Sequence, residues 1–162
     1  MSRLSHIAIL LTAATALLLA ACNDASCSDN GSSLPLAAFY FGNSQQTITG
    51  ITVMGIGAPG DSLLANASAL NELYLPLRAS ATTTSYRFVR TGTDGVSFID
   101  TVTIDYQPIE YFHSVECGAM YNFDIKQARC TTHGLDSIAV VTPLVTNSRT
   151  PALRIYFKTL TI

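Results

Sequence analysis

The stretch YRFVRTGTDGVSFIDTVTIDY, Tyr86 to Tyr106, decides the fold class of this chain. Apolar and polar residues alternate on both sides of Thr93-Asp94-Gly95. An Asp-Gly pair between two alternating runs is a strong signal for a β-hairpin. The alternation slips once, at Ile99-Asp100, which predicts a β-bulge at that position. The segment therefore predicts two antiparallel strands, each with one buried face.

Strand-like runs continue along the rest of the chain, separated by short turn sequences. These further runs are Leu36 to Phe41, Ile48 to Met54, Leu73 to Leu77, Ile109 to Val115, Ala119 to Ile125, Ser137 to Val141 and Leu153 to Phe157. No segment has a sustained helical period, and Ser62 to Leu70 is the best candidate for one short helical turn. We therefore expect an all-β fold, an antiparallel β-sandwich that is immunoglobulin-like or Greek key, with a barrel as the alternative.

The first 21 residues have the features of a lipoprotein signal peptide. Arg3 and His6 precede the apolar run Ile7 to Ala21, which is shorter than the roughly 20 residues that a membrane-spanning helix needs. Leu19-Ala20-Ala21-Cys22 has the form of a lipobox, in which the thiol of Cys22 receives a diacylglyceryl group. A plain secretory signal with an incidental cysteine is the alternative. We expect a lipid-anchored N-terminus at Cys22, a tether over residues 22–34 and one domain over residues 35–162.

Composition limits the partners of this domain. The chain is 48% hydrophobic and only 12% charged, and its net charge is −2. Such a chain has no electrostatic footprint for nucleic acid, and no polybasic patch flanks the anchor. We therefore expect no nucleic-acid partner. The expected partners are a membrane, held through the N-terminal lipid, and a glycan or protein of the cell envelope.

The chain has four cysteines. If Cys22 carries lipid, then Cys27, Cys117 and Cys130 remain, an odd number in an oxidising compartment. One disulfide and one free thiol is the simplest arrangement, and the spacing does not choose among the three bridges that these residues allow.

Several motifs together resemble a known family. They are a lipobox cysteine followed closely by a second cysteine, then LAAFYF, VMGIGAPGDS, LYLPL, TSYRFV, DTVTIDYQPIEYFHSVECG and a terminal RIYF. This set resembles a family of small, uncharacterised, Bacteroidetes-type envelope lipoproteins with a domain of unknown function. The resemblance spans nearly the whole mature chain and is most specific from Asp100 to Gly118.

The resemblance implies a disulfide between Cys27 and Cys117, with Cys130 free, and a bridge between Cys117 and Cys130 is the alternative. It also implies an outer-membrane lipoprotein of the cell envelope. It supplies no activity and does not decide between the periplasmic face and the cell surface.

The same resemblance draws attention to three Asp-Ser or Asp-Thr pairs. Bacteria of that group attach glycans to Ser or Thr that follows Asp and precedes a small or aliphatic residue. The matches are Asp61-Ser62-Leu63, Asp100-Thr101-Val102 and Asp136-Ser137-Ile138. Ser62, Thr101 and Ser137 are therefore candidate glycosylation residues, with Ser62 first because Pro59-Gly60 places it beside a loop. The alternative is that Asp favours the turn that precedes a strand.

No catalytic, cofactor or metal motif stands out. His113, Glu116 and Cys117, together with Cys130 and His133, are residue types that zinc binds, but their spacing fits no known finger or ribbon. A nucleophile pair of Cys130 and His133 lacks a third, orienting group nearby in the sequence. We expect no cofactor, no metal and no enzymatic activity.

The sequence favours a non-catalytic binding or accessory module of the envelope. Such a module would use loops and tyrosines, and the candidates are Tyr40, Tyr74, Tyr106 and Tyr111. The first alternative is an assembly subunit that pairs with a partner through an edge strand, for which Leu153 to Phe157 is the candidate. The second is a hydrolase of envelope polymers that uses His113, His133 and Cys130.

Overall fold

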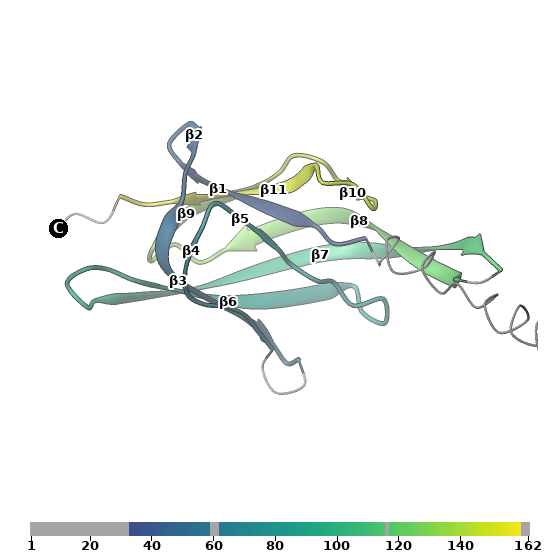
Figure 1. The fold of residues 1–162 in the computed structure, drawn as a ribbon, viewed down its shortest axis with the longest axis horizontal. Helices are drawn as coiled ribbons and strands as arrows, with labels where there is room; N and C mark the ends of the chain where they lie inside the picture. The colour runs from purple at the N-terminus through teal and green to yellow at the C-terminus, as the bar shows by residue number, and fades with distance from the viewer. Residues whose placement is uncertain (1–32, 59–61, 116, 160–162) are drawn as a thin grey trace, which may run out of the picture.

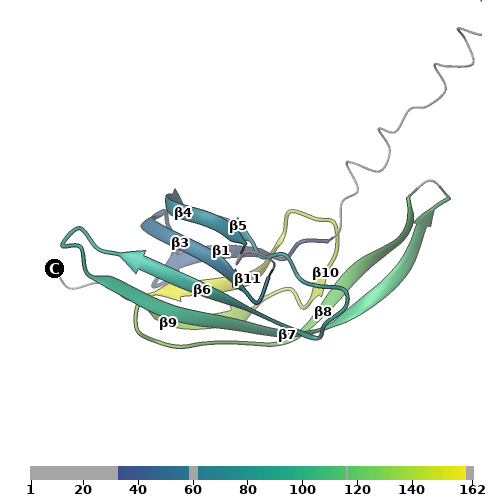
Figure 2. The same ribbon diagram turned by 90° about the horizontal axis from the view of Figure 1, so that it is seen from below.

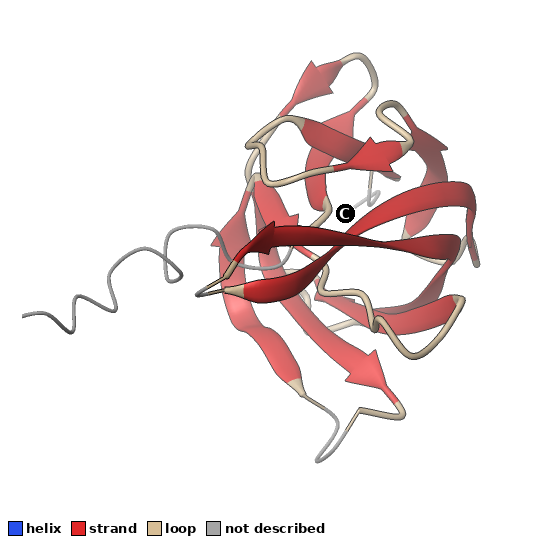
Figure 3. Ribbon diagram, turned by 90° about the vertical axis from the view of Figure 1, so that its right-hand side faces the viewer, coloured by secondary structure: helices blue, strands red, loops and turns tan. Residues whose placement is uncertain are grey.

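A computed structural model describes residues 33–58, 62–115 and 117–159. These residues form strands joined by loops, and the strands make two sheets packed against each other (Figures 1 and 3). The expected all-β sandwich is confirmed. Nowhere in this described part is there a helix long and apolar enough to cross a membrane. The expected signal peptide, residues 1–21, and nearly all of the tether lie outside the described residues.

The first sheet has the strand order β2-β1-β11-β9, and β5 also pairs with β1. Its strands are β1 (Leu36–Phe41), β2 (Ser44–Gln45), β5 (Glu72–Tyr74), β9 (Leu135–Val140) and β11 (Pro151–Phe157). The β1 and β11 strands are parallel, and the other pairs are antiparallel. Because β11 lies between β1 and β9, the prediction that Leu153 to Phe157 forms an edge strand is wrong: its backbone groups are paired on both sides.

The second sheet has the order β10-β8-β7-β6-β3-β4. Its strands are β3 (Ile48–Ile56), β4 (Leu63–Leu70), β6 (Thr83–Thr91), β7 (Ser97–Ser114), β8 (Gly118–Cys130) and β10 (Leu144–Val145). The helical turn expected at Ser62 to Leu70 is wrong, because this segment is the edge strand β4. Its pairing with β3 shifts register three times, and such irregularity in an edge strand disfavours pairing with a strand of another chain. Ile109 to Val115, expected as a separate strand, mostly continues β7.

The predicted hairpin is present as β6 and β7, but the predicted bulge is wrong. The register runs without a shift from Thr83 opposite Asp105 to Thr91 opposite Ser97. Asp100 is 2% exposed and shares the core face with Val102, which follows two positions later, whereas the Ile99 side chain is 54% exposed. The slip in the apolar pattern therefore marks a buried carboxylate, and β7 is regular at this position.

Aromatic rings pack together in the core, and the contact between Phe39 and Phe88 joins the two sheets. Phe39 of β1 makes edge contacts with Phe88 and Phe157, at centroid distances of 6.4 and 5.3 Å. Tyr106 and Phe123 make a second edge contact at 5.5 Å. Offset and edge contacts of this kind add to the stabilisation from apolar burial.

The pair β7–β8 extends beyond the rest of the sandwich as a two-stranded arm (Figure 2). We define the arm as residues 107–114 of β7, residue 115 of the turn that follows, and residues 118–122 of β8. Pairing with β6 stops at Asp105, and pairing with β10 stops at Phe123, so within the described residues the arm strands pair only with each other. The β6–β7 turn lies at the opposite end of the long axis (Figure 2).

Candidate functional site

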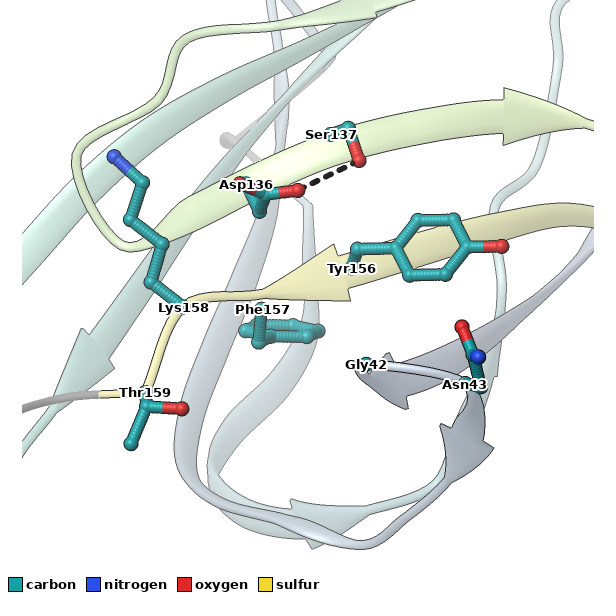
Figure 4. A pocket seen from close by; sticks show the side chains of 8 residues that line it. All are labelled: Gly42, Asn43, Asp136, Ser137, Tyr156, Phe157, Lys158 and Thr159. Carbon is teal, nitrogen blue, oxygen red and sulfur yellow. Dashed lines mark hydrogen bonds between the residues drawn. The ribbon is translucent and has the colours of Figure 1, made fainter.

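A surface hollow of about 700 Å³ lies where β1 and β11 end, next to β9 (Figure 4). It is lined by Gly42, Asn43, Asp136, Ser137, Tyr156, Phe157, Lys158 and Thr159. The β1–β2 turn, the start of β9 and the end of β11 thus supply the lining together.

A strip of aromatic side chains leads into this hollow across the outer face of the first sheet. Ser137, Tyr156 and Tyr40 are successive cross-strand partners, so their side chains share one face. The rings of Tyr40 and Tyr156 are 5.5 Å apart at 44°. The guanidinium of Arg154 lies 5.2 Å from the centre of the Tyr40 ring, within the range of a cation–π contact.

Polar groups surround Tyr156. Its ring lies between Ser137 on one side and Asn43 on the other (Figure 4). The Ser137 hydroxyl donates to the Asp136 carboxylate at 3.0 Å, and the Lys158 ammonium donates to the Thr132 carbonyl at 2.6 Å. The remaining polar side chains of the lining, those of Asn43 and Thr159, make no hydrogen bond to any described residue. The hollow thus offers an aromatic ring, available donors and acceptors, and one side chain of each charge.

A second polar centre lies around Asp100 and has a structural role. One carboxylate oxygen accepts from the Thr131 hydroxyl at 2.8 Å, and from the backbone and ring of His133 at 2.7 and 3.1 Å. The other accepts from the backbone amides of Gly134 and Leu135 at 2.7 and 2.9 Å. Burial by itself raises the pKa of this carboxyl, but the hydrogen bonds outweigh it, so the pKa is lowered.

Cys130 and His133 both lie near this centre. Burial, followed by the charges of Asp100 and Asp136, raises the pKa of the Cys130 thiol. A raised pKa keeps the thiol protonated at neutral pH, the reverse of what a thiolate nucleophile needs. The contact between Asp100 and His133 could not be predicted from the sequence, because the two residues are 33 positions apart.

A family model of unknown function, DUF6452, matches residues 50–157, two thirds of the chain. The chain belongs to the DUF6452 family. The DUF6452 match runs from β3 to the end of β11, so it contains Asp136, Ser137 and Tyr156 of the hollow but leaves Asn43 outside. No curated protein matches this chain. No solved structure matches it either.

Two of the cysteines of this DUF6452 protein are described. Cys117 is disulfide-bonded and Cys130 is a free thiol, so the alternative bridge between these two residues is absent. Cys27 and Cys22 lie outside the described residues, and the Cys27–Cys117 pairing and the lipidation of Cys22 stay predictions.

The zinc-type residues do not assemble into a site in the described part, where no group of three or more His, Cys, Asp or Glu side chains could hold a metal. His113 lies in β7, but its side chain and the whole of Glu116 are outside the part of the chain that the structure describes. Because Cys117 is in a disulfide, its sulfur is not available as a thiolate ligand.

The candidate glycosylation residues occupy different places on the DUF6452 fold. Ser62 is exposed just before β4, Ser137 is exposed in the hollow, and Thr101 is half-buried within β7. Asp61 lies outside the described residues. Asp100, which precedes Thr101, is buried and bonded, so an enzyme that acts on the folded chain would not reach it.

The four candidate tyrosines also lie in different parts of the fold. Tyr40 joins the aromatic strip, Tyr74 lies in β5 and Tyr111 lies in the arm. Tyr106 is buried, and its hydroxyl bonds to the backbone of Arg78. Tyr156 was not among the tyrosines predicted from the sequence, although its position between the apolar residues Ile155 and Phe157, both buried, favours an outward side chain.

Proposed function

We propose that this protein is a lipid-anchored, non-catalytic binding module of the cell envelope, one of the small Bacteroidetes-type outer-membrane lipoproteins that its motifs resemble. The lipobox at Cys22 supports the anchor. The observation that carries the binding role is the hollow beside the Tyr40–Tyr156 strip.

The chemistry of the hollow favours a saccharide as its ligand. The electron-rich face of Tyr156 suits the weakly positive C–H bonds of a sugar ring. The Asn43 amide and the Ser137 and Thr159 hydroxyls provide directional hydrogen bonds of the kind that fix a ligand's orientation. With Asp136 and Lys158 as its single acid and base, the hollow suits a neutral ligand better than a strongly anionic one.

Binding without turnover fits the groups in this hollow. Glycoside hydrolysis uses two carboxyl groups about 5 to 9.5 Å apart, whereas Asp136 is the one carboxylate of the lining. The raised pKa of the Cys130 thiol also argues against thiolate chemistry nearby.

Binding to a saccharide array and titration calorimetry with the best ligand test the proposal. We expect the purified lipoprotein to bind a neutral saccharide and Tyr156→Ala to weaken it about tenfold, or about 1.4 kcal/mol. Tyr111→Ala is the matched control because Tyr111 lies in the arm. A protein that binds no saccharide, or equal affinities for the two variants, would contradict the proposal.

A glycan attached to Ser137 would occupy the same hollow. The mass of the intact protein, read before the titration, shows whether Ser137 carries one. If it does, we expect the Ser137→Ala variant to bind the free saccharide more tightly than the glycosylated wild-type protein, because the attached glycan no longer fills the hollow.

A further inference from the structure

The tip of the arm carries the most exposed large apolar side chains of the described residues. At the tip, Val115 is 86% exposed and Phe112 is 70% exposed, and Ile109, nearer the base of the arm, is 40% exposed. All three belong to the arm, which projects beyond the sandwich (Figure 2). Solitary apolar residues on a surface are ordinary, but a group on a projecting hairpin marks an interaction surface.

The composition of the arm favours an apolar partner with a polar boundary. Residues 107–122 contain no lysine or arginine and two glutamates, Glu110 and Glu116. Tyr111 is next to Phe112 in β7, and tyrosine is enriched where hydrocarbon meets the headgroups of a bilayer. Contact with a nucleic acid or with an anionic surface is disfavoured by these charges.

The chain enters the fold at the base of the arm. Ser33 is 1% exposed, and its hydroxyl donates to the Asn122 side chain of β8 at 2.8 Å. Ser33 is 11 residues after Cys22, so the connecting segment spans at most about 40 Å. From Asn122 to the turn at Gly118 the arm rises only about 14 Å. A lipid on Cys22 can therefore lie in the bilayer that the arm tip touches.

The disulfide of Cys117 strengthens this connection. Cys117 lies in the turn at the tip of the arm. If its partner is Cys27, as the motifs imply, the tip is five residues from the lipidated cysteine, a reach of at most about 18 Å.

We propose that the arm tip is a membrane contact, with Phe112 and Val115 inserted into the interfacial layer of the bilayer that holds the lipid anchor. The inference rests on the proposed anchor at Cys22. Because β1 enters from the arm side and β11 runs parallel to it, the hollow at their ends then faces away from the bilayer (Figure 1).

Tryptophan fluorescence tests the contact, because the chain contains no tryptophan. Phe112→Trp reports from the arm tip, and Ile99→Trp, at a 54% exposed position near the opposite end, is the matched control. The lipidated variants are reconstituted into vesicles of the uncharged lipids phosphatidylethanolamine and phosphatidylcholine, with or without lipids brominated near the headgroup. We expect Phe112→Trp to shift its emission to shorter wavelength and to lose intensity with brominated lipid, and Ile99→Trp to do neither.

Three outcomes would overturn the inference in distinguishable ways. Equal quenching of the two variants on vesicles that carry the protein excludes an arm contact but leaves the anchor intact. A shift of Phe112→Trp emission without quenching, which grows with protein density, indicates a second copy as the partner. If protein from cells does not float with the vesicles and a Cys22→Ala variant behaves identically, the anchor itself is excluded, and the arm contact with it.

Discussion

At the residue scale, Asp100 is a carboxylate on the core face of β7, where the alternating pattern would place an apolar residue. Its two oxygens accept hydrogen bonds from the segment 131–135, and those bonds offset the cost of burying a carboxylate. The connection from β8 to β9 is thereby fixed to the first part of β7, which places Asp136 and Ser137 at the hollow.

We expect Asp100→Asn to lower the free energy of unfolding by about 2 to 4 kcal/mol at pH 7. An amide places an NH₂ group opposite donors, so either the Gly134 and Leu135 amides or the Thr131 and His133 donors lose their acceptor. Urea unfolding followed by circular dichroism measures the change. Asp94→Asn in the exposed β6–β7 turn is the control and should change stability little, whereas equal effects of both substitutions would refute the role given to Asp100.

The same carboxyl predicts a dependence on pH. Its pKa in the folded protein lies below the ordinary aspartate value of about 3.9, so the folded state prefers the ionised form. The stabilisation is fully present above the unfolded pKa and is lost as the pH falls through the lower folded pKa. Urea unfolding at pH 7 and at pH 2 should therefore show a smaller gap between wild type and Asp100→Asn in acid. A gap that does not change with pH would contradict this assignment.

At the element scale, β3 approaches β6 closely at Gly50. Its φ is +68°, and a Cβ atom added there would lie 2.5 Å from the Thr91 carbonyl oxygen. Because that oxygen belongs to the backbone of a paired strand, it has little room to move. A glycine is therefore required for both the backbone angle and the close approach.

We expect Gly50→Ala to destabilise the protein by about 2 to 4 kcal/mol, from left-handed strain together with overpacking. Gly57→Ala is the matched control, because Gly57 has φ +70° with nothing within 4 Å of the added atom. The control carries the strain without the clash and should cost about 1 to 2 kcal/mol. Thermal and urea unfolding compare the two variants, and equal losses would show that the contact with Thr91 has no effect.

Two predictions about strands, made from the sequence, were wrong. Leu153 to Phe157 alternates like a strand with one wet face, and it is in fact an interior strand between β1 and β9. The segment Leu63–Leu70, rich in alanine and leucine, has helical propensity but forms β4, because pairing with β3 outweighs a weak local preference. Local patterns predicted which segments form most of the strands, whereas the neighbours of a strand and its direction relative to them, such as the parallel pair β1–β11, depend on contacts far apart in the sequence.

At the scale of the whole molecule, the disulfide of Cys117 connects the arm to another part of the chain. We expect a non-reducing peptide map to contain Cys27 linked to Cys117, and the Cys130 peptide to carry an alkylating label. The bridge closes a loop of about 90 residues, which stabilises by about 4 to 5 kcal/mol in the chain-entropy account. Cys27→Ser should lose that amount in urea unfolding.

Cys130→Ser is the control for this loss, because its thiol is free and the substitution opens no bridge. A map that links Cys117 to Cys22 would exclude lipid on Cys22 in those molecules. It would also contradict the proposed anchor.

The sequence by itself determined the all-β class, the central hairpin, and the lipobox and cysteine count from which the anchor and the single bridge are predicted. These depend on residues that are close together in the chain, where alternation and turn chemistry act directly. Only the tertiary structure decided that Tyr40 and Tyr156 share one face, that Asp100 holds the segment 131–135, and that β7 and β8 project as an arm. The physical reason is that strand order and register bring distant residues together, and no local pattern encodes them.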